Sequence, residues 1–160
     1  MEENSLYDKK SLREIIGKSA DWNEVAKDCV AFSNAQGGVI DYGIEDDADA
    51  PPADQKVSEE IAINLEKKIS GKTQNVSVHA EIRTHENGGQ YIRLHIVRGT
   101  SSASTTSGKY FTRVSDESRP LTGDDITRLS AEKGYYRWED EESKWSWKDA
   151  DKEKLKVLLQ

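Results

Sequence analysis

The clearest apolar pattern lies in the first third of the chain. Asp21 and Glu24 have the spacing of a capping box, and apolar side chains then recur at helical intervals up to Asn34. A glycine pair follows, and after it the run VIDYGI at 39–44 is rich in strand-forming residues. The pattern predicts a helix, a tight turn and a strand in succession. The preceding residues 8–16 fit a short helix or a strand equally well.

A second helix and a β-hairpin are predicted in the middle of the chain. Ser58 is a candidate N-cap, and the apolar stripe that follows it continues to Gly71, where we expect the helix to stop. The segments 76–82 and 90–97 both alternate between apolar and polar residues. An Asn-Gly-Gly turn separates them, which is typical of a hairpin.

The last predicted elements are less regular. Residues 99–108, GTSSASTTSG, are low in complexity and predict a mobile loop that packs no core. A strand is predicted at 109–114, then a turn, then a helix from Thr122 toward Lys133. Helices and strands mix without regular β-α-β alternation. The predicted fold class is therefore α+β, a small mixed sheet with a hairpin and flanking helices.

The character of the chain changes at residue 134. We expect residues 8–133 to form one domain. Residues 134–160 are rich in Trp and in charge, and they end in a run that predicts the start of a helix. This extension is interpreted as a linker or as the start of the next domain of a longer protein.

The composition favours a compact domain with a solvated surface, since 34% of residues are hydrophobic and 33% are charged. No apolar run approaches the roughly 20 residues that cross a bilayer, and the polar N-terminus has no signal-peptide pattern. The single cysteine, Cys29, excludes an internal disulfide. We expect a cytoplasmic protein without a membrane segment.

Charge is distributed unevenly along the chain. The formal net charge of −7 argues against indiscriminate DNA binding, in which Lys and Arg neutralise phosphates. Residues 1–50 hold five basic and twelve acidic side chains, whereas residues 51–137 hold thirteen basic and eleven acidic ones. Ordinary surface charge explains this excess as well as phosphate contact does. The basic side chains gathered in one stretch of the middle segment are Arg93, Arg98, Lys109, Arg113, Arg119 and Arg128.

Two stretches of the chain resemble the Schlafen AlbA-like family. The first, AKDCVAFSNAQGGVIDYGIEDD, resembles the family's helix, Gly-Gly turn and strand, and the matching residues are Ala31, Phe32, Asn34, Gly37, Gly38, Gly43, Asp46 and Asp47. The second, GKYFTRVSDESRPLTGDDITRL, resembles the family's Tyr-Tyr-x-Arg-x-Gly-Ser-Ser-x-Arg stretch, and the matching residues are Tyr110, Arg113, Ser118 and Arg119. With the helix and hairpin between them, the resemblance covers about residues 10–133.

The resemblance implies a nucleic-acid-binding domain, with DNA as the expected partner, in a transcriptional regulator or a RecG-like helicase-related protein. Arginine forks suit phosphates, and a glycine turn lets a phosphate approach the backbone. The candidate contacts are Arg113, Arg119, Lys109, Asn34, Gly37 and Gly38. The glycine turn and the arginines have structural alternatives. The turn can serve as the C-cap of the helix, and the arginines can form ion pairs with Asp116, Glu117, Asp124 or Asp125.

Departures from the family pattern concern a possible nuclease activity and a turn. Some eukaryotic Schlafen relatives cleave RNA with acids near an N-terminal Glu-x-Lys motif and with the Asp after the first strand. We align the glutamate of that motif with Glu14. The motif requires a lysine two residues later, but the nearest lysine here is Lys18, four residues after Glu14. A nuclease would join Glu14 to Asp46 and Asp47 around a divalent metal, although a solvated turn is the favoured interpretation of the two aspartates. Ser115 replaces the family's turn glycine.

Three functions therefore stay open. The first is a nucleic-acid-binding module, which could act as a homodimer. The second is a metal-dependent nuclease. The third is an oligomerisation or partner-docking domain, a function that the acidic net charge would suit. Outside the nuclease alternative, no cofactor or metal is expected. His79, His85 and His95 lack the spacing of a metal site.

Overall fold

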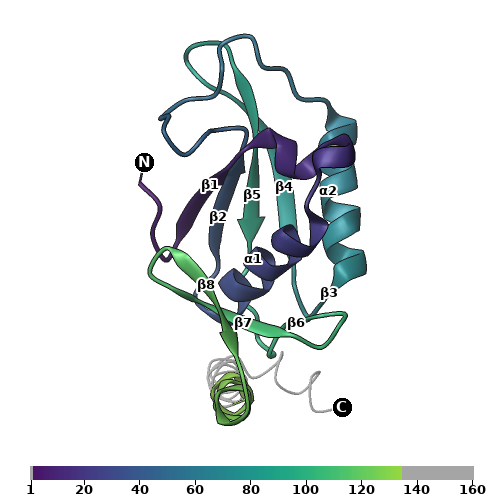
Figure 1. Ribbon diagram of the computed structural model, residues 1–160, viewed down its shortest axis with the longest axis vertical. Helices are drawn as coiled ribbons and strands as arrows, with labels where there is room; N and C mark the ends of the chain where they lie inside the picture. Colours follow the sequence, from purple (N-terminus) through teal and green to yellow (C-terminus); the bar gives the residue numbers. More distant parts are fainter. Residues whose placement is uncertain (1, 135–160) are drawn as a thin grey trace, which may run out of the picture.

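The computed structural model describes residues 2–134 and is built around one four-stranded sheet (Figure 1). The strand order is β1-β2-β5-β4. The outer strand β1 runs parallel to β2, and the other two pairings are antiparallel. These results confirm the α+β class. The strands are β1 (Tyr7–Lys10), β2 (Gly38–Tyr42), β4 (Val78–Thr84) and β5 (Gln90–Ile96).

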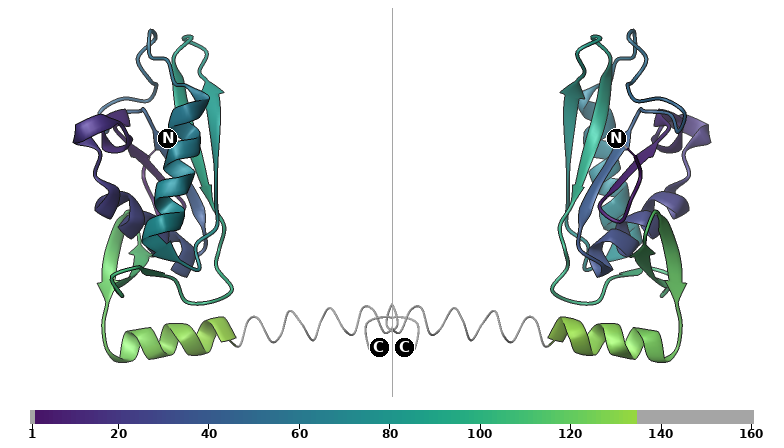
Figure 2. Two further views of the ribbon diagram at one scale, coloured as in Figure 1. Left: turned by 90° about the vertical axis from the view of Figure 1, so that its right-hand side faces the viewer. Right: turned by 90° about the vertical axis from the view of Figure 1, so that its left-hand side faces the viewer.

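Two helices, α1 (Trp22–Asn34) and α2 (Glu59–Lys72), cover one face of this sheet, and Figure 2 shows the opposite face without a helix among the described residues. The alternation of β5 explains the arrangement. Its Ile92, Leu94 and Ile96 are buried toward the helices, whereas the intervening side chains lie on the open face. The predicted hairpin of β4 and β5 is confirmed.

The start of α1 follows from its capping residue. The Asp21 carboxylate accepts a hydrogen bond from the Glu24 amide at 3.2 Å, as the capping box predicts. The helix ends at Asn34, and Gly37 lies at a φ of +74° where the chain turns into β2. A Cβ atom on Gly37 would lie 2.7 Å from the Ile96 carbonyl oxygen. Only glycine fits this close approach of two backbones.

The ambiguous segment 8–16 contains both kinds of structure. It begins within the strand β1 and continues into a 3-10 helix, η1 (Leu12–Ile15), and a second 3-10 helix, η2 (Gly17–Ser19), follows the segment. Ser11 caps η1 by accepting a hydrogen bond from the Arg13 amide. The strand forms because β2 offers it a parallel partner, which a local pattern does not show.

The expectation that residues 99–108 pack no core is wrong for part of that segment. Ala103 is fully buried. The next two residues form the short strand β6 (Ser104–Thr105), which pairs with β3 (Thr73–Gln74). A long-range amide clamp from Asn34 on α1 holds this segment, so its composition alone gave no signal. Helix α2 also continues through Gly71 by one residue.

A second hairpin packs on α1. Its strands are β7 (Tyr110–Val114), which was predicted, and β8 (Glu117–Leu121), which the sequence suggested as a turn. Ser115 in the connecting turn has a φ of +57°, the conformation that the family's glycine would adopt freely.

Residues 124–134 are helical, as expected from the Thr122 cap. The predicted boundary at 134 and the extension after it fall almost wholly outside the described residues, so this division stays a prediction. No helix within residues 2–134 is long and apolar enough to cross a membrane.

Candidate nucleic-acid interface

A buried cluster of charges joins the second hairpin to the sheet and α1. Arg113 on β7 lies 3.3 Å from the Asp8 carboxylate on β1, and both side chains are at most 3% exposed. Its guanidinium also lies over the Phe32 ring, 4.5 Å from the centroid. Ser118 on β8 donates a hydrogen bond of 2.7 Å to Asp28 on α1. The cluster ties three elements together.

Lys10 completes the cluster between the two aspartates. Its ammonium lies 3.7 Å from one oxygen of Asp8 and 3.7 Å from one oxygen of Asp28. Burial works against the charge of Lys10, but the carboxylates of Asp28 and Asp8 together raise its pKa. Burial raises the pKa of Asp28 despite the nearby Lys10 charge. The cluster is therefore balanced by charges from distant parts of the chain.

A carboxyl trio lies at the edge of this cluster. The Glu3 side chain lies beside the carboxyl groups of Asp8 and Asp46. Partial burial and these two acidic neighbours raise the pKa of Glu3 to about 7. A carboxyl group with such a pKa can hold or release a proton near neutral pH, which is the property of a general acid or base.

The trio as arranged does not fit a metal ion. One Asp8 oxygen accepts a hydrogen bond from the Lys9 amide, and the other faces Lys10 and Arg113. Within residues 2–134, no three His, Cys, Asp or Glu side chains are grouped so as to hold a metal.

The residues predicted for a nuclease are only partly near this trio. Asp46 belongs to it. Glu14 instead interacts with Lys10 and Asp28, and its pKa is raised, first by burial. Lys18 and Asp47 are exposed in the structure.

An acid-x-Lys pair does exist on a strand, but six residues before the predicted one, as Asp8 and Lys10 of β1. The sequence contains this spacing as Asp8-Lys9-Lys10. It was not identified because residues 8–16 could not be assigned to a strand from the local pattern. Glu3, which sequence reasoning missed, had no local signal because its role depends on Asp46.

The predicted phosphate-binding arginines differ in their surroundings. Arg113 is buried in the charged cluster, so its guanidinium faces Asp8 and not solvent. Arg119 is exposed and pairs with Glu117 at 3.1 Å, which is the ion-pair alternative anticipated from the sequence. Lys109 is exposed and lines a groove with Lys72 and Phe111.

Asn34 and the glycine turn have structural tasks in this fold. The Asn34 side-chain amide donates to the carbonyl oxygens of Ala103 and Phe111 and accepts from the Ala103 amide, at 2.7–2.9 Å. Gly37 and Gly38 make the tight entry into β2. These contacts hold the 99–108 segment and β7 beside the end of α1.

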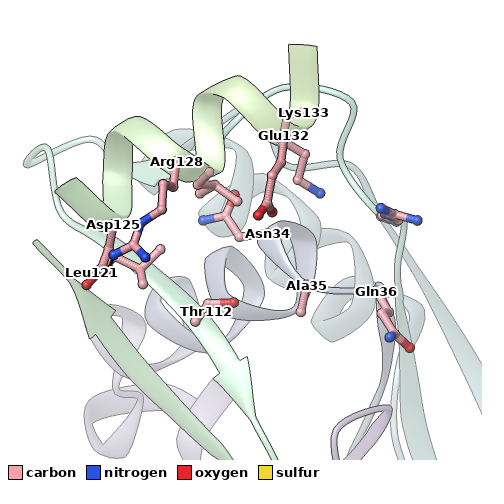
Figure 3. A pocket seen from close by; sticks show the side chains of 11 residues that line it. Asn34, Ala35, Gln36, Thr112, Leu121, Asp125, Arg128, Glu132 and Lys133 are labelled. Atoms are coloured by element: carbon pink, nitrogen blue, oxygen red, sulfur yellow. Dashed lines mark hydrogen bonds and ion pairs between the residues drawn. The ribbon is translucent and has the colours of Figure 1, made fainter. Parts of the chain in front are cut away.

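A cavity of about 430 Å³ opens beside Asn34 (Figure 3). The helix at 124–134 lies above it, the hairpin of β7 and β8 lies below, and the end of α1 forms its rear wall. Its uncharged walls come from four segments that are far apart in sequence, and they comprise Asn34, Ala35, Gln36, Thr112, Leu121 and Leu129.

Three cations and two acids line this cavity. The cations are Arg98, Arg128 and Lys133, and the acids are Asp125 and Glu132. Arg128 pairs with Asp125 at 2.6 Å. Burial and the nearby charge of Arg98 lower the pKa of Lys133, which means that this part of the cavity disfavours a further positive charge. An anion would reverse that effect.

Comparisons with known proteins agree with this fold. No curated protein matches the chain. A solved structure, that of the DIP2311 protein from Corynebacterium diphtheriae, is similar with a TM-score of 0.52 and 17% sequence identity. The similarity covers 73% of this chain and 25% of that chain, so the present sequence spans only a quarter of its structural relative. At this identity the likeness concerns the fold alone.

The family comparison is more specific. The model of the family described as Schlafen, AlbA_2 matches residues 3–122. This range includes the first stretch singled out in the sequence, the second stretch as far as Thr122, the charged cluster and part of the cavity wall. This family points to a nucleic-acid-related function. Since the match covers well over half of the chain, the protein belongs to the Schlafen, AlbA_2 family.

Proposed function

We propose that this domain binds nucleic acid at the end of the molecule formed by the hairpin of β7 and β8 and the helix at 124–134. The observation that carries the proposal is the cavity lined by Arg98, Arg128 and Lys133. Guanidinium and ammonium groups at one concave surface are the usual contacts of phosphate oxygens. In a longer protein the domain would serve a transcriptional regulator or a helicase-related enzyme, with DNA as the first expected partner.

A second groove extends the same surface. Phe111 of β7 lines the groove that contains Lys72 and Lys109, while its neighbour Thr112 lines the cavity. Successive side chains of a strand point to opposite sides, so β7 separates two depressions, each of which is lined by three cations and two acids. A backbone that passes around β7 would meet lysine and arginine side chains on both sides.

The test is fluorescence polarisation with labelled single-stranded DNA, duplex DNA and RNA, at low and at physiological salt. We expect salt-sensitive binding that falls at least tenfold in the double variant Arg98→Ala/Arg128→Ala. The matched control is Arg83→Ala, because Arg83 is an exposed arginine on β4, outside both depressions. Equal loss in the control, or no binding at low salt, would contradict the proposal.

The carboxyl trio favours a second candidate function, phosphodiester cleavage. Its specific observation is the grouping of the Glu3, Asp8 and Asp46 carboxyl groups. The pKa of Glu3, raised to about 7 by burial and these neighbours, suits proton transfer at neutral pH. In this candidate the chain's own contribution is to hold and move a proton at the Glu3 carboxylate.

Cleavage is measured with end-labelled RNA and DNA, with Mg²⁺, with Mn²⁺ and with a chelator. We expect Glu3→Gln and Asp46→Asn to lower the cleavage rate at least a hundredfold, while the exposed Asp54→Asn leaves it unchanged. A wild-type chain that binds substrate but cleaves nothing in any of these conditions would exclude the activity and leave the binding proposal intact.

A further inference from the structure

The cations of the cavity lie at different depths. Lys133 is only 4% exposed, and its ammonium donates one hydrogen bond within the described residues, to the Ser33 carbonyl oxygen at 3.3 Å. Arg128 is largely exposed at the rim, where it pairs with Asp125. A continuous duplex backbone is convex and would meet the rim arginine, but it would not reach Lys133. A ligand that uses Lys133 must enter the cavity.

The charge inside the cavity favours a doubly charged anion. Arg98 and Lys133 line the same space, and their mutual repulsion together with burial lowers the pKa of Lys133. A bridging phosphodiester carries a single negative charge. A terminal phosphomonoester carries about −1.5 to −2 at neutral pH and offers three acceptor oxygens. It would therefore offset the repulsion between the two cations more fully.

The size and the other walls of the cavity suit a single nucleotide. Its volume of about 430 Å³ lies within the range of roughly 300–1,000 Å³ that small ligands occupy. Leu121 and Leu129 supply apolar contact, and the Thr112 hydroxyl and Gln36 amide supply polar contacts for a sugar or a base. The helix at 124–134 and the hairpin lie on two sides of the cavity (Figure 3).

From these observations we propose that the cavity receives the terminal phosphate of a single-stranded nucleic acid, so that the domain recognises strand ends. This inference rests on the proposed nucleic-acid binding and adds a specificity to it. Lys133 and Arg98 hold the phosphate, and Arg128 at the rim contacts the next phosphate of the strand. The Glu132 carboxylate, which also lines the cavity, repels a phosphate, so binding requires both Lys133 and Arg98 to offset that repulsion.

The experiment uses the full 160-residue chain and single-stranded 12-residue oligonucleotides that carry a 5′-phosphate, a 3′-phosphate or hydroxyl groups at both ends. The fluorescent label lies at the end opposite to the phosphate. We expect at least tenfold tighter binding for one of the phosphorylated strands. In Lys133→Met this preference should disappear, while the affinity for the hydroxyl strand changes less than about twofold.

Controls separate the outcomes. If Lys133→Met lowers the melting temperature, Arg98→Gln tests the same phosphate contact with a residue that is exposed. Arg83→Ala is the matched control and must keep the preference for the phosphorylated strand. Salt-sensitive binding with equal affinity for phosphate and hydroxyl ends would overturn the strand-end proposal and leave nucleic-acid binding intact. Displacement of the phosphorylated strand by an equal concentration of a mononucleotide or of inorganic phosphate would also overturn it. The ligand would then be a free nucleotide or free phosphate, and not a strand end. No binding to any strand would contradict both proposals.

Discussion

At the scale of single residues, Glu3 shows how the fold changes the chemistry of a side chain. A glutamate near the N-terminus of a chain is ordinarily ionised at neutral pH. Here burial and two carboxyl neighbours raise its pKa to about 7. Asp46 lies more than forty residues after Glu3 and follows β2, which pairs with β1, so its contribution to the shift is a property of the tertiary structure.

The raised pKa predicts how stability depends on pH. The folded state binds the Glu3 proton more tightly than the unfolded state, so the stabilisation is complete below pH 4.5 and is lost as the pH rises to about 7. Glu3→Gln should therefore be more stable than wild type at pH 8, by roughly 1 kcal/mol after allowance for solvent screening. The two proteins should be equally stable near pH 4.

Urea denaturation at several pH values checks this expectation. Glu2→Gln, which removes a neighbouring exposed carboxylate, is the charge-matched control. A constant difference between Glu3→Gln and wild type from pH 4 to pH 8 would show that the Glu3 proton is not linked to folding.

At the scale of elements, the hairpin of β7 and β8 is attached to the rest of the domain partly through buried charges. Arg113 connects it to β1 through Asp8, and Ser118 connects it to α1 through Asp28. Removing one partner of a buried ion pair leaves the other charge without compensation, which is more costly than losing an exposed pair. The hairpin therefore offers two arginines for a direct comparison.

Arg113→Ala should destabilise the protein by about 3–5 kcal/mol, because Asp8 stays buried without its closest cation. Arg119→Ala on the next strand should cost less than about 0.5 kcal/mol, because its pair with Glu117 is exposed. Chemical denaturation of the two variants measures the difference. Equal costs would mean that Arg113 is solvated in solution, and Arg113 would then return as a candidate phosphate contact.

Elements were predictable where their causes are local. The capping box of Asp21 and the apolar period after it were sufficient for α1, and the alternation was sufficient for β4 and β5. Strand β8 was missed because Glu117–Leu121 has few apolar residues and is stabilised by pairing with β7. Strand β6 was missed because its Ser and Thr residues are ordered by pairing with the distant strand β3.

At the scale of the whole molecule, the cations proposed to bind nucleic acid lie at one end, although the net charge is −7. The short segments and hairpins at this end bring together side chains that lie between residues 72 and 133. They are Lys72, Arg98, Lys109, Arg128 and Lys133. The acidic excess of residues 1–50 belongs largely to other surfaces and to the buried cluster.

This distribution limits the salt dependence of binding. If all five cations contact phosphates of a single strand, the slope of log K against log salt concentration should be about −3.5. A titration between 50 and 300 mM NaCl measures it. A slope steeper than about −6 would require phosphate contacts beyond these five side chains, and a slope near zero would show that binding does not rest on phosphate charges.

The sequence by itself determined the α+β class, the course of α1, α2, β2, β4, β5 and β7, and the family, because capping, periodicity and short motifs are local properties. It could identify Asn34, Gly37 and Arg113 as special, but not what they do. Only the tertiary structure decided that Asn34 clamps Ala103, that Arg113 is buried against Asp8, and that Glu3 meets Asp46. The physical reason is that ion pairs, clusters of carboxyl groups and cavities depend on distances between segments far apart in sequence, which packing alone sets.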